Sequence, residues 1–144
     1  MALTQYDIFI RLLVGLGLSV LIGLERELKS VPAGLRTHAL VGIGATLFTV
    51  MSLTFQGPNV DVSRVAAQIV IGIGFIGGGV IFKSENKVKG MTTAAGLWVV
   101  TAIGIAAGLG EFFAAAITTA AVLLLLVFGR IFETKTLKKR KIEW

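Results

Sequence analysis

The side chains best suited to chemistry gather in three short segments of an otherwise apolar chain. These segments are residues 23–30 (GLERELKS), 31–40 (VPAGLRTHAL) and 89–98 (KGMTTAAGLW). They offer carboxylates, guanidinium groups, an imidazole and hydroxyls, which could form ion pairs or an anion-binding helix start. The residues of this polar cluster are Glu25, Arg26, Glu27, Arg36, Thr37, His38, Thr92 and Thr93.

Glu25 has two interpretations. In the first, it lies at a solvated helix end and pairs with Lys29, four residues on, with little gain in stability. In the second, it points back among the helices and pairs with Arg36 or Arg26 where the dielectric constant is low. Ionisable groups at membrane depth tend to be functional, so the second interpretation predicts a functional site. The sequence leaves both open.

His38 is the only histidine and the chain has no cysteine, so a multi-histidine metal site and thiolate chemistry are both excluded. We expect His38 to form hydrogen bonds near a helix start. Thr37, Thr92 and Thr93 are also expected at helix starts, where a hydroxyl can accept from free backbone N–H groups. Because no nucleophile is paired with a base, we predict that the chain is not an enzyme.

Carboxylates that could bind a hard cation such as magnesium fall at the ends of the apolar stretches. None lies in the middle of a stretch, where a selective cation pathway usually places carboxylates or carbonyls. This pattern argues against a dedicated pump or channel. We predict no cofactor and leave magnesium binding open. The candidate ligands are Glu25, Glu27 and Glu85 on one side, and Asp7, Asp61 and Glu111 on the other.

Five apolar stretches must position these residues. The chain is 55% hydrophobic with a mean hydropathy of +0.87, and only 15% of its residues are charged, against about 25% in a soluble domain. We predict an all-α, polytopic membrane bundle of about five transmembrane helices in residues 1–132, with a basic cytoplasmic tail in 133–144. The stretches are residues 8–24, 39–55, 65–82, 92–110 and 112–129.

The last two stretches are separated by Glu111 alone. A tight hairpin is one solution for such a short connection. A single long broken helix or a re-entrant pair is the alternative, and the sequence does not decide between them.

The net charge of +6 is divided unevenly between the two ends of the predicted bundle. If successive helices alternate in direction, twelve basic residues fall on one side and only Arg11 and Arg64 on the other. The positive-inside rule then predicts an outside N-terminus and a cytoplasmic C-terminus. This distribution also argues against nucleic acid as a partner. The twelve are Arg26, Lys29, Arg36, Lys83, Lys87, Lys89, Arg130, Lys135, Lys138, Lys139, Arg140 and Lys141.

The third stretch, RVAAQIVIGIGFIGGGVIF, is predicted to be the packing centre of the bundle. Glycines within a membrane let a second helix approach closely, and Gly74 and Gly78 have the small-xxx-small spacing. Gly72, Gly74 and Gly77 match a dinucleotide-binding fingerprint, but the strand and the acidic residue which that motif needs are missing. The predicted helix-packing glycines are Gly72, Gly74, Gly77, Gly78, Gly104 and Gly108.

Polar residues also mark the opposite side of the bundle. Asp61 and Arg64 are expected in the outer connection before the third stretch. Gln68 lies one turn inside that stretch and is expected to hydrogen-bond across helices. The fifth stretch is bulky and featureless, so we expect it to face lipid.

Four blocks in order resemble the MgtC/SapB family of bacterial inner-membrane proteins. The blocks are IGLERE (22–27), PAGLRTHALVGIGA (32–45), RVAAQIVIGIGFIGGGVI (64–81) and KGMTTAAGLWVVTAIGIAAG (89–108). The resemblance implies a five-span domain and a link to survival at low magnesium. It further implies that virulence-type members restrain the F-type ATP synthase. Those members carry a further C-terminal soluble domain and often Asn where Thr92 stands, so a SapB-like member is expected here.

Two functions follow from these observations. The first is a non-enzymatic regulator in the bacterial inner membrane, acting by helix contact with other membrane proteins and forming a homodimer or higher homo-oligomer. The second is a transporter or channel for magnesium or another small ion. Ion flux into liposomes that contain only this protein separates the two.

Overall fold

The structure, a computed structural model, describes residues 3–84 and 87–136. Glu85, one of the candidate cation ligands, lies outside these residues. Residues 137–144 also lie outside them, and these hold Lys138, Lys139, Arg140 and Lys141 of the predicted basic tail.

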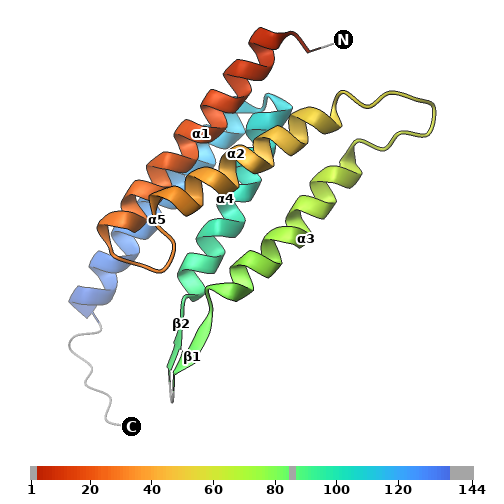
Figure 1. The fold of residues 1–144 in the computed structure, drawn as a ribbon. Coiled ribbons are helices and arrows are strands. Elements are labelled where there is room, and N and C mark those ends of the chain that lie inside the picture. The colour runs from red at the N-terminus through yellow and green to blue at the C-terminus, as the bar shows by residue number, and fades with distance from the viewer. Residues whose placement is uncertain (1–2, 85–86, 137–144) are drawn as a thin grey trace.

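Five helices and a two-stranded hairpin follow one another along the described chain (Figure 1). The predicted all-α bundle of five helices is therefore confirmed. Three helical segments are long and apolar enough to cross a membrane, namely α1, α4 and Phe112–Gly129 of α5, and α3 is a shorter apolar helix. The elements are α1 (Gln5–Leu28), α2 (Leu35–Ser52), α3 (Ser63–Gly79), β1 (Phe82–Ser84), β2 (Lys87–Lys89), α4 (Met91–Leu109) and α5 (Phe112–Thr136).

Successive helices run in opposite directions (Figure 1). The ends of α1 and α3 therefore lie at the same end of the bundle as the starts of α2 and α4. The β1–β2 hairpin lies there too, so we call it the hairpin end. All three segments of the polar cluster reach this end, as alternation of the helices predicted.

The ends of the helices are set by local hydrogen bonds. At the start of α1, the Asp7 backbone N–H donates to the Thr4 hydroxyl at 3.1 Å and the Thr4 N–H donates to the Asp7 carboxylate at 3.0 Å, which is a capping box. At the end of α4, Gly110 adopts a left-handed φ of 87°, and the Glu111 N–H donates to the Ala106 carbonyl at 2.9 Å. This termination makes α4 and α5 two separate helices and rules out one continuous broken helix.

α2 packs closely between α1 and α4. On one side, a side chain at Gly15 or Gly42 would overlap Thr46 or Ser19 across the α1–α2 contact. On the other, a Cβ at Gly104 would lie 2.6 Å from the Gly42 carbonyl oxygen. Packing at these glycines follows the rule that small residues let membrane helices approach. The prediction for Gly104 is confirmed.

Gly108 extends this contact along α4. A Cβ there would lie 2.6 Å from Thr49 Cβ and 2.8 Å from the Thr46 carbonyl oxygen. The prediction that Gly108 packs against another helix is thus also confirmed.

α3 is not the packing centre, and that prediction was wrong. A Cβ built at Gly72, Gly74 or Gly78 would meet no neighbouring atom within 4 Å. Gly77 alone among the predicted α3 glycines faces another helix, with a built Cβ 3.7 Å from Ala94 Cβ in α4. The cause is that α3 diverges from α2 (Figure 1) and buries only its Ile73–Gly77 side.

The predicted third stretch also ended too late. α3 stops at Gly79, and Phe82 begins β1, which pairs antiparallel with β2 in the register Phe82–Lys89. Gly90 closes this hairpin with a left-handed φ of 90°. Any side chain at Gly90 would overlap the Val80 carbonyl, so only glycine fits between the hairpin and α4.

Burial differs sharply between the last two helices. Within the apolar window of α4, 56% of the residues are buried, against 11% for Phe112–Gly129 of α5. The bulky fifth stretch therefore presents most of its surface outward, in agreement with the expectation that it faces lipid.

Candidate functional site

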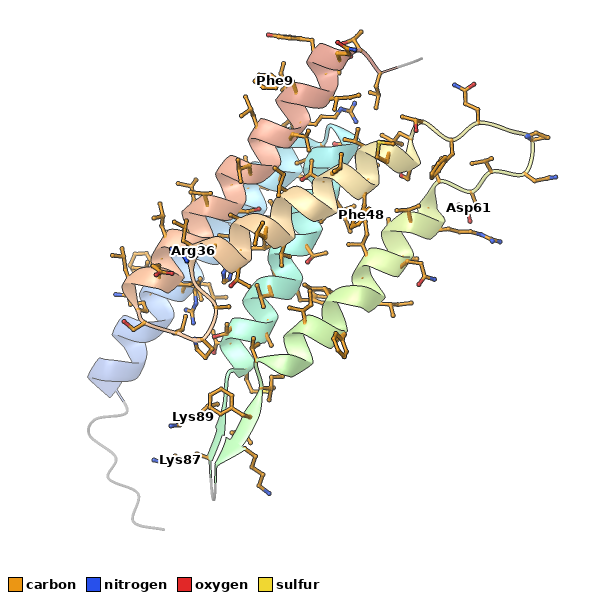
Figure 2. All side chains as sticks on the ribbon, in the orientation of Figure 1. Phe9, Arg36, Phe48, Asp61, Lys87 and Lys89 are labelled. Atoms are coloured by element: carbon orange, nitrogen blue, oxygen red, sulfur yellow. The ribbon has the colours of Figure 1, made fainter. Side chains whose placement is uncertain are left out.

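Glu25 and Arg26 form a buried ion pair at the hairpin end of α1. Arg26 Nη1 lies 3.4 Å from Glu25 Oε2, and the two side chains are 9% and 10% exposed. The interpretation that Glu25 pairs among the helices is therefore confirmed, with Arg26 as its partner. Arg36 is the wrong partner, because its side chain is exposed and makes no ion pair with the described residues (Figure 2).

His38 lies fully buried one turn inside α2. Its Nδ1 is 2.8 Å from the Gly34 carbonyl oxygen, so the expected hydrogen bond near a helix start is confirmed. Gly23 of α1 and Gly96 of α4 face the ring. Cβ atoms built on them would lie 3.1 Å from His38 Cβ and 3.6 Å from His38 Nε2, respectively.

Glu27 caps α2. The Leu35 backbone N–H donates to Glu27 Oε2 at 2.9 Å, and a side chain at Gly34 would overlap that carboxylate. A carboxylate here satisfies a free N–H group and complements the positive end of the helix dipole.

The predicted threonine caps were wrong. Gly34 and Gly90 occupy the N-cap positions of α2 and α4, without a side-chain cap. Thr37, Thr92 and Thr93 lie in the first turns, and none of their hydroxyls forms a hydrogen bond within the described part of the chain. The reason is that glycine, which has no side chain to cap with, occupies the cap position at both starts; at α2 the Glu27 carboxylate accepts from the Leu35 N–H instead.

Three buried side-chain atoms at the hairpin end have no hydrogen-bond partner among the described residues. They are Glu25 Oε1, Arg26 Nε and His38 Nε2. About nine-tenths or more of buried polar atoms are bonded in folded proteins, and each exception costs about 1–3 kcal/mol. The hairpin end therefore holds buried polar atoms that the described residues leave unsatisfied.

Arg11 provides a polar contact at the opposite end that sequence reasoning missed. Its Nη1 donates to the Gly108 carbonyl at 2.5 Å. A Cβ built on Gly110 would lie 3.0 Å from Arg11 Nη2. A cation at the end of α4 satisfies a free carbonyl and complements the helix dipole. The signal was an arginine inside an apolar stretch, which must reach a polar partner.

The outer connection before α3 is held by Asp61. Its carboxylate accepts from the Ser63 hydroxyl at 2.6 Å and the Ser63 N–H at 3.0 Å. These bonds hold the pKa of Asp61 below its ordinary value. Arg64 lies 3.8 Å away on the exposed surface, a distance at which an ion pair adds little.

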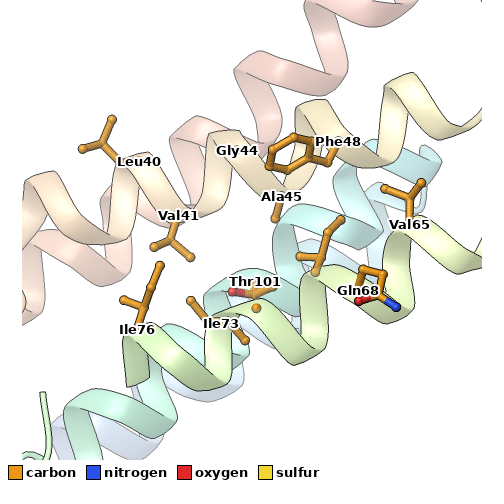
Figure 3. A pocket seen from close by; sticks show the side chains of 12 residues that line it. Leu40, Val41, Gly44, Ala45, Phe48, Val65, Gln68, Ile73, Ile76 and Thr101 are labelled. Carbon is orange, nitrogen blue, oxygen red and sulfur yellow. The ribbon is translucent and has the colours of Figure 1, made fainter. Parts of the chain in front are cut away.

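An apolar groove of about 540 Å³ separates α2 from α3 (Figure 3). Gly44 and Gly72 stand on its two walls, and a Cβ built on either would meet no atom within 4 Å. Gln68 lines the groove with an exposed side chain. Its predicted hydrogen bond across helices is not among those of the described residues. The other lining residues include Leu40, Val41, Ala45, Phe48, Val65 and Ile76.

Within residues 3–84 and 87–136, no group of three His, Cys, Asp or Glu side chains could hold a metal ion. The candidate carboxylates are spread between the two ends of the bundle. Asp7 belongs to the capping box of α1, Asp61 accepts hydrogen bonds from Ser63, and Glu27 caps α2.

Comparison with known proteins gives one family and several relatives. The family model that matches is described as the MgtC family and covers residues 12–135. YhiD of Escherichia coli K12, whose name proposes a magnesium transporter, is 41% identical over 113 residues, which are 74% of this chain and 53% of that protein. Protein MgtC of Salmonella typhimurium LT2 is 45% identical over 108 residues, 75% of this chain and 46% of that protein.

Protein MgtC of Brucella abortus is 48% identical over 99 residues, which are 69% of this chain and 41% of that protein. The chain thus spans about half the length of the curated relatives it matches. None of these names describes an enzyme. No solved structure matches the chain.

Proposed function

The chain belongs to the MgtC family, and on that premise we propose that it is a non-enzymatic protein of bacterial magnesium homeostasis. We place it in the inner membrane as a multi-pass protein with its C-terminus in the cytoplasm. It acts by contact of its helices with those of a membrane partner. The groove between α2 and α3 is the surface that receives a partner helix.

The groove carries this proposal because both of its walls contain an open glycine. A helix that packs at Gly44 and Gly72 can approach the backbone of α2 and α3 closely, and such contacts hold membrane helices together. Gln68 offers an amide that can donate to and accept from a polar group on that helix. An apolar transmembrane helix with one polar residue fits this lining.

Photocrosslinking tests the contact directly. Phe48 lines the groove and is 61% exposed, whereas Phe9 of α1 is 58% exposed and lies away from it (Figure 2). A photoreactive phenylalanine analogue at Phe48 is expected to capture a membrane protein in living cells, and the same analogue at Phe9 is not. Capture of a second copy would identify the homo-oligomer, and capture of lipid alone would overturn the proposal.

A growth assay tests whether the contact matters. Gly72→Leu fills the groove, while Gly17→Leu adds the same bulk to an open position of α1. We expect only Gly72→Leu to lose complementation at limiting magnesium, with equal membrane levels on immunoblots. Equal growth of the two variants would show that the groove is not needed for growth at limiting magnesium. In the crosslinking experiment, capture of an ATP synthase subunit at Phe48 would indicate that this chain contacts the F-type ATP synthase. The resemblance implies such a role for virulence-type members.

Transport of magnesium or another small ion is the second candidate. The name of the E. coli relative supports it, and so does the buried polar region at the hairpin end. Liposomes that contain only this protein should show no magnesium flux under the regulator proposal. Flux above that of empty liposomes would establish transport instead.

A further inference from the structure

The three unpartnered atoms at the hairpin end have defined hydrogen-bonding roles. In a neutral ring whose Nδ1–H donates to the Gly34 carbonyl, Nε2 of His38 carries a lone pair and accepts. Glu25 Oε1 also accepts, and the Nε–H of Arg26 donates. A group that satisfies all three must provide two donors and one acceptor.

Water is the ligand with this chemistry. A metal cation would meet the positive charge of Arg26, which accompanies Glu25 in the pair. An anion would meet the carboxylate and the lone pair of the ring. A neutral molecule with two O–H donors and an acceptor oxygen meets neither objection, and buried waters typically form about three such bonds.

Gly96 leaves room beside the ring. A Cβ built on it would lie 3.6 Å from His38 Nε2 and within 4 Å of no other atom of a neighbouring element. Glycine at this place in α4 thus keeps open the space next to the lone pair. Any larger residue would occupy it.

We propose that the hairpin end holds an internal water that donates to Glu25 Oε1 and His38 Nε2, accepts from Arg26 Nε, and carries protons to His38. A hydrated proton gives its H⁺ to Nε2, which leaves water and an imidazolium with both nitrogens protonated. The imidazolium adds one positive charge beside the Glu25–Arg26 pair. This site is independent of the α2–α3 groove.

The surroundings of the ring are otherwise neutral. Among the described side chains, Arg26 and Glu25 of α1 are the charged groups that act on His38. α4 contributes Gly96 to this contact, and the buried Thr93, three residues earlier in α4, is uncharged. Protonation of the His38 ring therefore changes the electrostatic surroundings of one ion pair, Glu25–Arg26.

The single histidine makes the test direct. The full chain is labelled with ¹⁵N-histidine, placed in lipid bilayers and studied by solid-state NMR. At neutral pH we expect a proton on Nδ1, none on Nε2, and magnetisation transfer between Nε2 and water. On acidification, Nε2 should gain a proton while the bundle stays folded. A proton on Nε2 at neutral pH, or no transfer from water, overturns the proposal.

Gly96→Ala separates hydration from folding. Its methyl group stands at ordinary contact distance from Nε2, so the fold should persist while the water is displaced. We expect loss of the water transfer with the Nδ1–H form retained. Gly17→Ala, at an open position of α1 outside the groove, should keep the transfer. Retention of the transfer in Gly96→Ala overturns the placement of the water. If Gly96→Ala does not fold, the wild-type spectrum still decides.

Discussion

Burial of the Glu25–Arg26 pair sets the cost of breaking it. Removing either partner leaves the other charged and almost fully enclosed, which costs about 3–5 kcal/mol for a buried pair. We expect Glu25→Ala and Arg26→Ala each to lower thermal stability in detergent strongly. The double variant should lose less than the sum of the two, since both share one interaction.

Arg36→Ala provides the control at the same end of the bundle. Its side chain is exposed, so its loss should change stability by no more than about 0.5 kcal/mol. A loss comparable to that of Arg26→Ala would mean that Arg36 supports the pair after all.

Asp61 gives a residue-scale prediction about pH. Hydrogen bonds from Ser63 to the carboxylate lower the pKa of Asp61. A lowered folded pKa means that this stabilisation is complete above the ordinary value of about 4 and is lost as pH falls through the lowered pKa. Carboxyl ¹³C NMR should show Asp61 titrating below a model peptide. Ser63→Ala should move the titration back toward the peptide value, and an unchanged midpoint would contradict the assignment.

Among the elements, the hairpin depends on one glycine. Gly90 has a left-handed backbone, and a side chain there would overlap the Val80 carbonyl. The backbone strain alone costs about 1–2 kcal/mol, and the overlap adds to it. Gly90→Ala should therefore unfold at a clearly lower temperature than wild type. Gly78→Ala, in the open part of α3, should be neutral or slightly stabilising because alanine favours helices.

The contact between α2 and α4 gives the second element-scale prediction. A Cβ at Gly104 would press on the Gly42 carbonyl, while Gly74 has open space. Overpacking costs about 1–3 kcal/mol, so Gly104→Ala should destabilise the bundle and Gly74→Ala should not. Thermal unfolding in the same detergent compares them. Equal stability of the two variants would contradict the close contact between α2 and α4 at Gly104.

The whole molecule shows which inferences a sequence can support. The five helices were predictable because apolar runs of membrane-spanning length leave few alternatives. The position of α3 was not, since glycines show that a helix can be approached but not which helix approaches it. For the buried partner of Glu25, the sequence left Arg26 and Arg36 both open. It could not favour Arg26, because adjacent residues along a helix do not usually face each other. The β1–β2 hairpin was missed because its polar sequence suggests a loop.

The orientation of the whole molecule in the membrane rests on the distribution of charge. Lys83, Lys87 and Lys89 lie at the hairpin end together with the polar cluster (Figure 2), and Asp61 lies in the connection between α2 and α3. Basic residues are retained on the cytoplasmic side, so the hairpin should face the cytoplasm and Asp61 the outside. Since the chain has no cysteine, Asp61→Cys and Lys87→Cys each introduce a single thiol. A membrane-impermeant maleimide should label only the first in intact cells and both after permeabilisation. Labelling of position 87 from outside would reverse the orientation.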